Sequence, residues 1–366
     1  MKIDSCLIIK NEEENIEKLI NKLLMFSNEV HITDTGSTDD TINIIERLMQ
    51  DNNNLFLHHF EWCFDFSKAR NYSLTCYECN ADYQFWCDGD DELNDKLIET
   101  LIDFTKSYHT EDIYFIPYKY HEDQNYNQNR TSLLKVSAKF EWYDPIHEFL
   151  RCNDRTCNYD YFYNGSLIIH HKNANIDHNK RNLEIFFNME RNGYQFTCRN
   201  RYYYGGELHD AQLRELAIVQ YHKCIDSTDE QINYVDQINS CMGLIYLKDP
   251  ECLIYFQKLF NKGIYRKDLF YLLGDYFYEL GNIDLARLYY VLCINCEEPP
   301  FHYMFEYDGS CYVNALLQLG LIEYNKGNID NAMFYNNHIL SIDPDNAIAK
   351  NNIEYIKTNN IDNKNE

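Results

Sequence analysis

The chain has 366 residues, of which 45% are hydrophobic and 15% aromatic, so it can bury more than one core and is expected to form two globular domains. Its formal net charge of −25 would repel nucleic-acid backbones and anionic membrane surfaces, which excludes both as expected partners. The sequence contains no uncharged apolar run of about 18 residues and no signal-peptide core, so we expect a cytoplasmic protein without a transmembrane segment.

The first half of the chain alternates short apolar runs with helical patterns. The runs are bounded by polar or turn residues, which is typical of buried strands. Helical periodicity follows the first three runs, and Ser37 is expected to cap the second helix. Strands separated by helices indicate a largely parallel sheet covered on both faces, since parallel neighbours need long crossovers. The predicted strands are 5–9, 30–34, 55–60 and 83–87.

Polar residues follow three of these strands. In parallel sheets, ligands bind beyond the carboxyl ends of the strands, so we expect all of these side chains to line one cleft. Polar turns at strand ends are common, but the concentration of acids after the fourth strand favours a functional site. The residues concerned are Lys10, Asn11, Glu12, Asp34, Thr35, Asp88, Asp90 and Asp91.

The acidic stretch FWCDGDDEL, residues 85–93, needs a compensating cation or hydrogen-bond network because crowded carboxylates repel one another. Asp88 and Asp90 are two residues apart, and Gly89 between them permits an unusual backbone turn. Together they can supply hard oxygen ligands to Mg²⁺ or Mn²⁺. Such an under-filled site suits a metal that also bridges to phosphate oxygens of a substrate.

Four segments together resemble the family 2 glycosyltransferases. LIIKNEEENI, VHITDTGSTDDT, FEWCFDFSKARNYSL and FWCDGDDEL occur in the order and spacing of that family, strongly over residues 3–95 and more weakly to about residue 172. The resemblance implies a GT-A fold, a nucleotide-sugar donor, a metal ion (Mn²⁺ or Mg²⁺) and inverting transfer. UDP is the nucleotide that family habit favours.

The resemblance also implies roles for single residues. The segment 8–12 would lie against the nucleoside base, and Asp34 would hold the base or the ribose. Lys68 and Arg70 would form a basic pair at the nucleotide end of the donor. The residues expected to contact the nucleotide are Ile9, Asn11, Glu12, Asp34, Lys68, Arg70 and Asp88.

Near the metal, Asp90 would be the main ligand and Asp88 would face both ribose and metal. Asp91 has two alternatives: it contacts the donor sugar, or it caps a helix that starts near Glu92. The run SLIIHHKN is a predicted strand whose His170 and His171 point to opposite faces. The resemblance implies His171 as a further metal ligand, and a structural role is the alternative.

EWYDPIHEFL, residues 141–150, resembles the His-Glu segment that a subset of these enzymes carries on the acceptor side. In an inverting displacement a carboxylate takes the proton of the acceptor nucleophile. Glu148 is the first candidate for this base and Asp144 the second. The structural alternative is that Asp144 opens a turn before Pro145 and that Glu148 pairs with a nearby arginine.

The second half is helical and self-similar from about residue 196. Gly205, Gly274 and Gly320 are each followed twelve residues later by alanine, and the last two copies share Leu-Gly and Gly-Asn-Ile-Asp. This is the tetratricopeptide pattern, with a degenerate unit around Gly243 as a candidate further copy and 297–309 as an inserted loop. Small residues are expected where the paired helices touch, with aromatic rings between them.

The expected division is therefore a GT-A domain over 1–175 and an all-α tetratricopeptide-like domain over 176–366. We expect a metal-dependent transferase whose acceptor is a hydroxyl or thiol on a protein, peptide or glycan, with the repeats as a binding groove or as a brace. The rival hypothesis is a non-catalytic scaffold that binds a partner through its helical groove. The oligomeric state is left open by the sequence.

Two CxxC spacings remain outside this scheme. Cys76/Cys79 and Cys293/Cys296 are the only close pairs among the fourteen cysteines. Such pairs are a weak zinc signal, and buried reduced thiols are the favoured interpretation.

Overall fold

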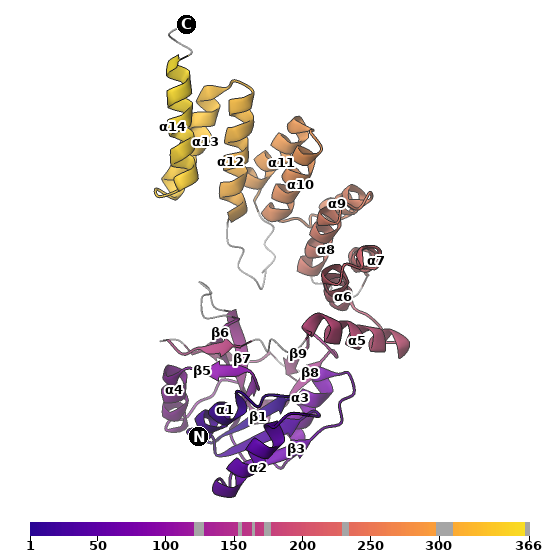
Figure 1. Cartoon of the computed structure of the whole chain (residues 1–366), viewed down its shortest axis with the longest axis vertical. Helices are drawn as coiled ribbons and strands as arrows, with labels where there is room; N and C mark the ends of the chain where they lie inside the picture. Colours follow the sequence, from indigo (N-terminus) through magenta and orange to yellow (C-terminus); the bar gives the residue numbers. More distant parts are fainter. Residues whose placement is uncertain are drawn as a thin grey trace. The chain divides into compact units, whose positions relative to one another are not determined.

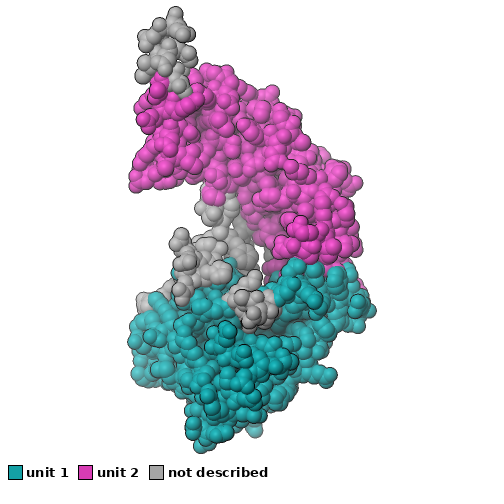
Figure 2. All heavy atoms as spheres, viewed as in Figure 1, with its two compact units in different colours: residues 1–194 teal, residues 195–366 magenta. Residues whose placement is uncertain are grey.

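The computed structural model describes residues 1–120, 128–152, 156–162, 165–171, 177–228, 234–297 and 310–362. The chain forms two compact units, Met1–Tyr194 and Gln195–Glu366 (Figure 2). The first unit extends past the expected boundary at residue 175 because it includes α5 (His178–Arg191). Phe186 of α5 stacks near His147, and the Arg181 guanidinium lies 4.9 Å from the centroid of the Phe66 ring.

Four parallel strands form one half of the main sheet in the order β3-β2-β1-β4. All seven residues of β1 are buried, as expected for a central strand covered on both faces. All four predicted strands are confirmed, with bounds that differ by one or two residues. They are β1 (Ile3–Ile9), β2 (Glu29–Asp34), β3 (Leu55–His59) and β4 (Tyr83–Asp88) (Figure 1).

The crossover helices cover both faces of this half. Residues of α1 (Ile16–Leu23), α2 (Thr41–Asp51) and α4 (Asp95–Thr105) share a core with Leu7 and Ile9. Leu74 of α3 (Phe66–Thr75) packs with Cys6 and Trp86 on the opposite face. One expectation was wrong here: α2 begins at Thr41, so Ser37 does not cap it, and the Ser37 hydroxyl instead accepts from the backbone N–H of Asn11.

The other half of the sheet is mixed, and among the described residues it completes nine strands. The strand β7 pairs antiparallel with both β4 and β6, and β11 pairs parallel with β6 and antiparallel with β5. A separate hairpin, β8 with β9, lies beside α3. The bounds are β5 (Asp91–Leu93), β6 (Ile113–Lys119), β7 (Gln128–Lys135), β8 (Phe140–Tyr143), β9 (Phe149–Cys152), β10 (Tyr159–Tyr161) and β11 (Ile168–His170), with a 3₁₀ turn at Val136–Ala138.

The second unit consists of helices in antiparallel pairs, as the tetratricopeptide pattern predicts. The degenerate unit around Gly243 is confirmed as a helix pair, whereas the expected insertion at 297–309 lies, apart from its first residue, outside the described residues. Among the helices that the structure describes, none combines the length and apolarity needed to cross a membrane. The helices are α6 (Cys198–Asp210), α7 (Arg214–Ile225), α8 (Tyr234–Tyr246), α9 (Cys252–Asn261), α10 (Lys267–Glu279), α11 (Ile283–Asn295), α12 (Ser310–Asn325), α13 (Ile329–Ile342) and α14 (Ala347–Asp362).

Three of the helix glycines lie where an aromatic ring of a neighbouring helix presses on the backbone, whereas at Gly320 the Asn336 amide takes that place, 2.9 Å from the Cβ position. A Cβ at Gly205 would meet the Tyr221 ring at 2.5 Å, and one at Gly243 would meet the other side of the same ring at 2.6 Å. Tyr290 packs against Gly274 in the same way. The expectation that small residues meet aromatic rings in this unit is confirmed at Gly205, Gly243 and Gly274 and wrong at Gly320. Because Tyr221 is buried, its ring has no free space into which to retreat.

Two neighbouring glycines in α6 provide a direct test. Gly205→Ala should destabilise the protein by about 1–3 kcal/mol, since the new methyl group overlaps the Tyr221 ring. Gly206→Ala should be neutral or stabilise by up to about 1 kcal/mol, because nothing lies within 4 Å of its Cβ position and alanine favours the helix. Urea unfolding of both variants would measure the difference. Equal stabilities would contradict the packing described.

Candidate functional site

The ends of β1 and β2 are tied together by polar side chains. The carboxylate of Asp34 accepts hydrogen bonds from the backbone N–H groups of Gly36 and Ser37, which closes the turn after β2. The Asn11 side chain accepts from the Thr38 N–H, and the Ile9 carbonyl accepts from the Thr35 hydroxyl. The structure thus brings the expected nucleotide-contacting residues of the first two strands into one edge of the sheet.

Two arginines hold Asp88 at the end of β4. Arg70 from α3 donates to Oδ1 at 2.8 Å, and Arg130 from β7 donates to Oδ2. Burial alone would raise the pKa of Asp88, but the charges of Arg130 and Arg70 outweigh it and lower the pKa well below its usual value. Both guanidinium groups lie over the Trp86 ring, at 4.7 and 4.0 Å from its centroid. Each oxygen of Asp88 therefore has one lone pair taken by an arginine, and a metal would have to share the carboxylate with these two cations.

Arg130 is the site residue that sequence reasoning missed. It is largely buried, and it also donates to Asp91 Oδ2 at 2.7 Å. The one sequence signal is a charged residue two positions before the buried run Ser132–Leu134 of β7. Its partners could not have been inferred, because β7 lies beside β4 only through an antiparallel pairing that the parallel pattern did not predict.

Asp91 is held by three groups of the protein. Besides Arg130, it accepts from the Tyr118 hydroxyl at 3.1 Å and from the Asp88 N–H at 2.8 Å. The expected alternative that it caps a helix starting near Glu92 was wrong: residues 91–93 form β5, and α4 begins at Asp95 with Asn94 as its cap. A short strand forms there because β11 supplies an antiparallel partner.

Asp90 and His170 form the part of the cluster that faces outward from the arginines. In the β5–β11 pairing His170 is the partner of Asp91, which places its Nδ1 3.4 Å from Asp90 Oδ1 and 3.6 Å from Asp91 Oδ1. Nδ1 is buried and has no well-directed hydrogen-bond partner. Burial lowers the pKa of His170, but the nearby carboxylates of Asp90 and Asp91 outweigh it and raise the pKa to about 10. The potential ligand atoms of Asp90, Asp91 and His170 all lie within 4.8 Å of one another.

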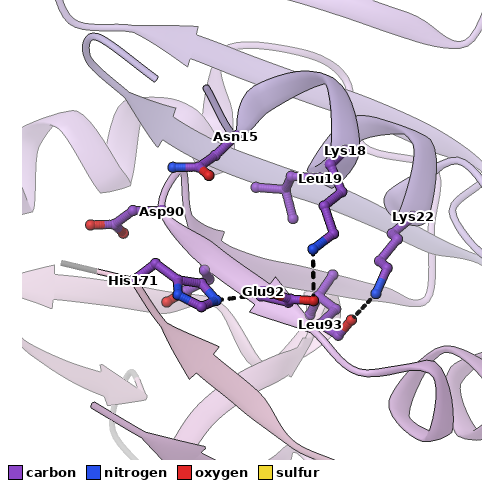
Figure 3. Close-up of a pocket in the computed structure, with 9 residues that line it drawn as sticks. Asn15, Lys18, Leu19, Lys22, Asp90, Glu92, Leu93 and His171 are labelled. Atoms are coloured by element: carbon purple, nitrogen blue, oxygen red, sulfur yellow. Dashed lines mark hydrogen bonds and ion pairs between the residues drawn. The ribbon is translucent and has the colours of Figure 1, made fainter. Parts of the chain in front are cut away.

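His171, the histidine expected at the metal, lies just beyond β11. Its Nε2 bonds to Glu92 Oε2 at 2.9 Å, and the other oxygen of Glu92 accepts from Lys18 at 2.8 Å. Figure 3 shows this chain of side chains along a shallow pocket beside the acidic turn, with Asp90 standing apart from it. The β5–β11 register therefore brings the neighbouring His170, and not the His171 imidazole, to Asp90 and Asp91.

Glu12 lies behind the acidic turn. It is 6% exposed, and its Oε2 has no hydrogen-bond partner. Burial, followed by the negative charge of Asp90, raises the pKa of Glu12 to about 8. A Cβ at Gly89 would lie 2.8 Å from Glu12 Cγ, so the glycine is required for close approach rather than for a left-handed turn.

The two candidate bases are both hydrogen-bonded. Glu148 Oε1 accepts from Arg70 Nε at 2.6 Å, which confirms the expected alternative of a pairing with an arginine. Asp144 precedes Pro145 at a φ of +69° and accepts from the Tyr194 hydroxyl at 2.8 Å. Lys68 is separated from Arg70: its side chain is 68% exposed, with Nζ 3.2 Å from Asp65.

Comparison with known proteins identifies the family of the domain that carries this site. Residues 5–172 match the family described as Glycosyl transferase family 2, and residues 313–346 match a tetratricopeptide repeat. Residues 5–172 are a glycosyl transferase family 2 domain. The resemblance inferred from the four sequence segments is confirmed, and so is the tetratricopeptide pattern of the second unit.

Curated relatives of the chain include two glycosyltransferases. The SPbeta prophage-derived glycosyltransferase SunS of Bacillus subtilis (strain 168) and glycosyltransferase SunS of Bacillus phage SPbeta are each 22% identical over 247 residues. The alignment covers 63% of this chain and 56% of each relative, so the chain spans little more than half of their length.

Solved structures with some likeness include TarS of S. aureus and YrrB. TarS 1–349 is 15% identical, with a TM-score of 0.38, and covers 79% of this chain and 90% of its own. YrrB, described as a tetratricopeptide protein with an unusual peptide-binding site, is 20% identical, with a TM-score of 0.33, and covers 48% of this chain and 82% of its own.

The buried Glu12 carboxyl predicts a pH-dependent stability. Its folded pKa of about 8 exceeds the ordinary value of 4.5, so the unfolded chain loses this proton first as the pH rises. In the presence of a chelator, the unfolding free energy of the wild type should fall relative to that of Glu12→Gln between about pH 4.5 and 8 and then run parallel to it. Denaturant unfolding at several pH values would measure this. Glu14→Gln, at an exposed position, should show no such difference from the wild type.

The arginine contacts predict a large effect of one substitution. Arg130→Met would leave the buried carboxylate of Asp91 without its cation and remove one of the two cations of Asp88, at a cost of about 3–5 kcal/mol. Arg47→Met is the matched control, because the Arg47–Glu17 pair is more than half exposed on the arginine side and should contribute less than about 1 kcal/mol. Similar unfolding free energies for the two variants would refute the role given to Arg130.

Proposed function

We propose that this chain is a glycosyltransferase that moves a sugar from a nucleotide diphosphate donor, with UDP as the nucleotide, to an acceptor hydroxyl or thiol. The observation that carries the proposal is the position of Asp90, Asp91 and His170 at one edge of the sheet, inside the domain that matches glycosyl transferase family 2. The chain covers only part of its relatives, so the proposal is made from this site and not from their names.

The charge balance of the site supports a requirement for a divalent cation. Even with His170 protonated, four carboxylates face three cations, so a diphosphate would meet net negative charge. Asp90, Asp91 and His170 would hold Mn²⁺ or Mg²⁺, whose charge would offset that of the departing diphosphate. The groups counted are Asp88, Asp90, Asp91 and Glu148 against Arg70, Arg130 and His170.

The chain's own residues would place the donor. Asn11 and Asp34 shape the turns that would border the nucleoside, and their bonds to backbone N–H groups fix those turns before a ligand arrives. Arg70 and Arg130 would act mainly by fixing Asp88 in one orientation, because their charges are already compensated. Lys68, which is exposed, remains the proposed mobile cation at the nucleotide end.

For the acceptor, we keep Glu148 as the first candidate base and Asp144 as the second. The hydrogen bond from Arg70 would hold Glu148 in position. The positive charge of Arg70 would also make Glu148 a weaker proton acceptor. The inverting outcome rests on the family assignment. A protein, peptide or glycan acceptor held by the helical repeats is the proposed partner, since stacked helix pairs form extended binding surfaces.

A panel of nucleotide sugars, each with and without Mn²⁺, tests the proposal. The unfolding temperature should rise with one UDP-sugar in the presence of Mn²⁺. The same mixture should slowly release free UDP. Asp90→Asn should lose at least tenfold in UDP release while keeping the wild-type fold by circular dichroism, because it removes a ligand without removing packing.

Asp103→Asn is the matched control, since its exposed carboxylate pairs with Lys106 on the outer face of α4, and it should behave as the wild type. If no donor shifts the unfolding temperature of the wild type or of Asp90→Asn, the transferase proposal is wrong. The scaffold hypothesis would then take its place.

A further inference from the structure

A second group of metal-binding side chains lies at the opposite end of the sheet from the donor site. Asp4 of β1 and Glu29 of β2 are direct partners in the parallel register, near the amino ends of both strands. His31 follows Glu29 by two residues, so alternation places it on the same face. The ligand atoms of Asp4, Glu29 and His31 all lie within 4.8 Å of one another.

The CxxC segment that follows α3 covers this group. The Cys79 thiol donates to Asp4 Oδ2 at 3.5 Å, and the Tyr77 ring stacks on the His31 imidazole with their centroids 3.4 Å apart. Carboxylate and imidazole groups from two strands are therefore gathered at one point, and the thiol of the segment after α3 touches this group at Asp4. This is the mixed donor set that zinc takes, and a thiolate would disfavour Mg²⁺ or Ca²⁺.

Asp4 is a buried carboxylate without a matching cation. It is 1% exposed, and within the described residues no lysine or arginine pairs with it. Its hydrogen-bond donors are neutral and long: Asn28 Nδ2 at 3.3 Å, the Tyr77 hydroxyl at 3.3 Å and the Cys79 thiol. Burying a carboxylate that has only neutral, long hydrogen bonds costs folding free energy, and a bound cation would offset that cost.

The surroundings of His31 agree with metal binding. Its Nδ1 lies 3.0 Å from His58 Nε2, and its Nε2 lies 3.0 Å from Glu29 Oε2. If Nδ1–H donates to His58, the lone pair of Nε2 faces the carboxylate and requires a cation between them. A metal-bound histidine is usually oriented by a hydrogen bond from its other ring nitrogen in this way.

We propose that Asp4, Glu29 and His31 bind one Zn²⁺ ion as a structural site, distinct from the donor site, and that the Cys79 thiol beside Asp4 moves in as the fourth ligand. Four protein ligands would close the tetrahedral shell, and binding would release the thiol proton of Cys79 to solvent. The ion would link β1 and β2 to the segment after α3. Glu29, whose side chain is 38% exposed, leaves a route for the ion to enter.

The test uses the full chain, stripped with a chelator and then given Zn²⁺ in the presence of excess Mg²⁺. We expect about one zinc per chain after gel filtration and a higher unfolding temperature than in the stripped protein. Co²⁺ in place of Zn²⁺ should give the thiolate-to-cobalt charge-transfer absorption of a Cys ligand. Cys79→Ser should abolish that band and weaken zinc binding at least tenfold.

Two controls separate this site from other metal binding. Cys63→Ser removes an exposed thiol elsewhere, and Asp90→Asn removes a ligand of the proposed donor site; both should keep the zinc and the cobalt band. The proposal is overturned if the folded wild type retains no zinc and shows no thiolate band. It is equally overturned if Cys79→Ser retains zinc as tightly as the wild type, because the cluster is then a hydrogen-bond network only.

Discussion

The pairing of Asp88 with two arginines is the interaction around which the first unit is organised. One arginine comes from α3 on the parallel side of the sheet and the other from β7 on the antiparallel side. Both lie over Trp86, which precedes Asp88 by two residues and therefore shares its face of β4. Packing on the indole lets the two like-charged guanidinium groups approach one carboxylate, and their charges hold Asp88 ionised.

This arrangement has a consequence for the rest of the acidic turn. Arg130 engages both Asp88 and Asp91, whereas Asp90 has no arginine partner among the described residues and faces His170, which Asp91 also approaches at 3.6 Å. The crowded acids thus divide into a structural part, Asp88 held by two arginines, and a part suited to a cation, Asp90 with Asp91, of which Asp91 also pairs with Arg130. Glu12 lies behind both parts and avoids adding a further charge because its burial favours the protonated form.

The second unit depends on a different constraint, which is close approach of helix backbones. Tyr221 is pressed between Gly205 and Gly243, and Tyr290 against Gly274, so each ring fills the space that a missing side chain leaves. These contacts join helices that follow one another in the chain, so the repeated glycines and tyrosines can be recognised in the sequence. The two units therefore differ in kind: one is held by contacts between distant segments and the other by contacts between neighbours.

The sequence by itself determined the four parallel strands, the helical pairs and the acidic cluster at a strand end. These features depend on short-range periodicity and on the rule that parallel strands end at one edge. The tertiary structure decided which of the clustered groups meet. The pairing of β11 with β5 places His170 rather than His171 beside Asp90. The antiparallel pairing of β7 with β4 places Arg130 beside Asp88. Strand register between segments far apart in the chain leaves no local trace, because a shift of one residue exchanges the two faces of a strand while its composition stays the same.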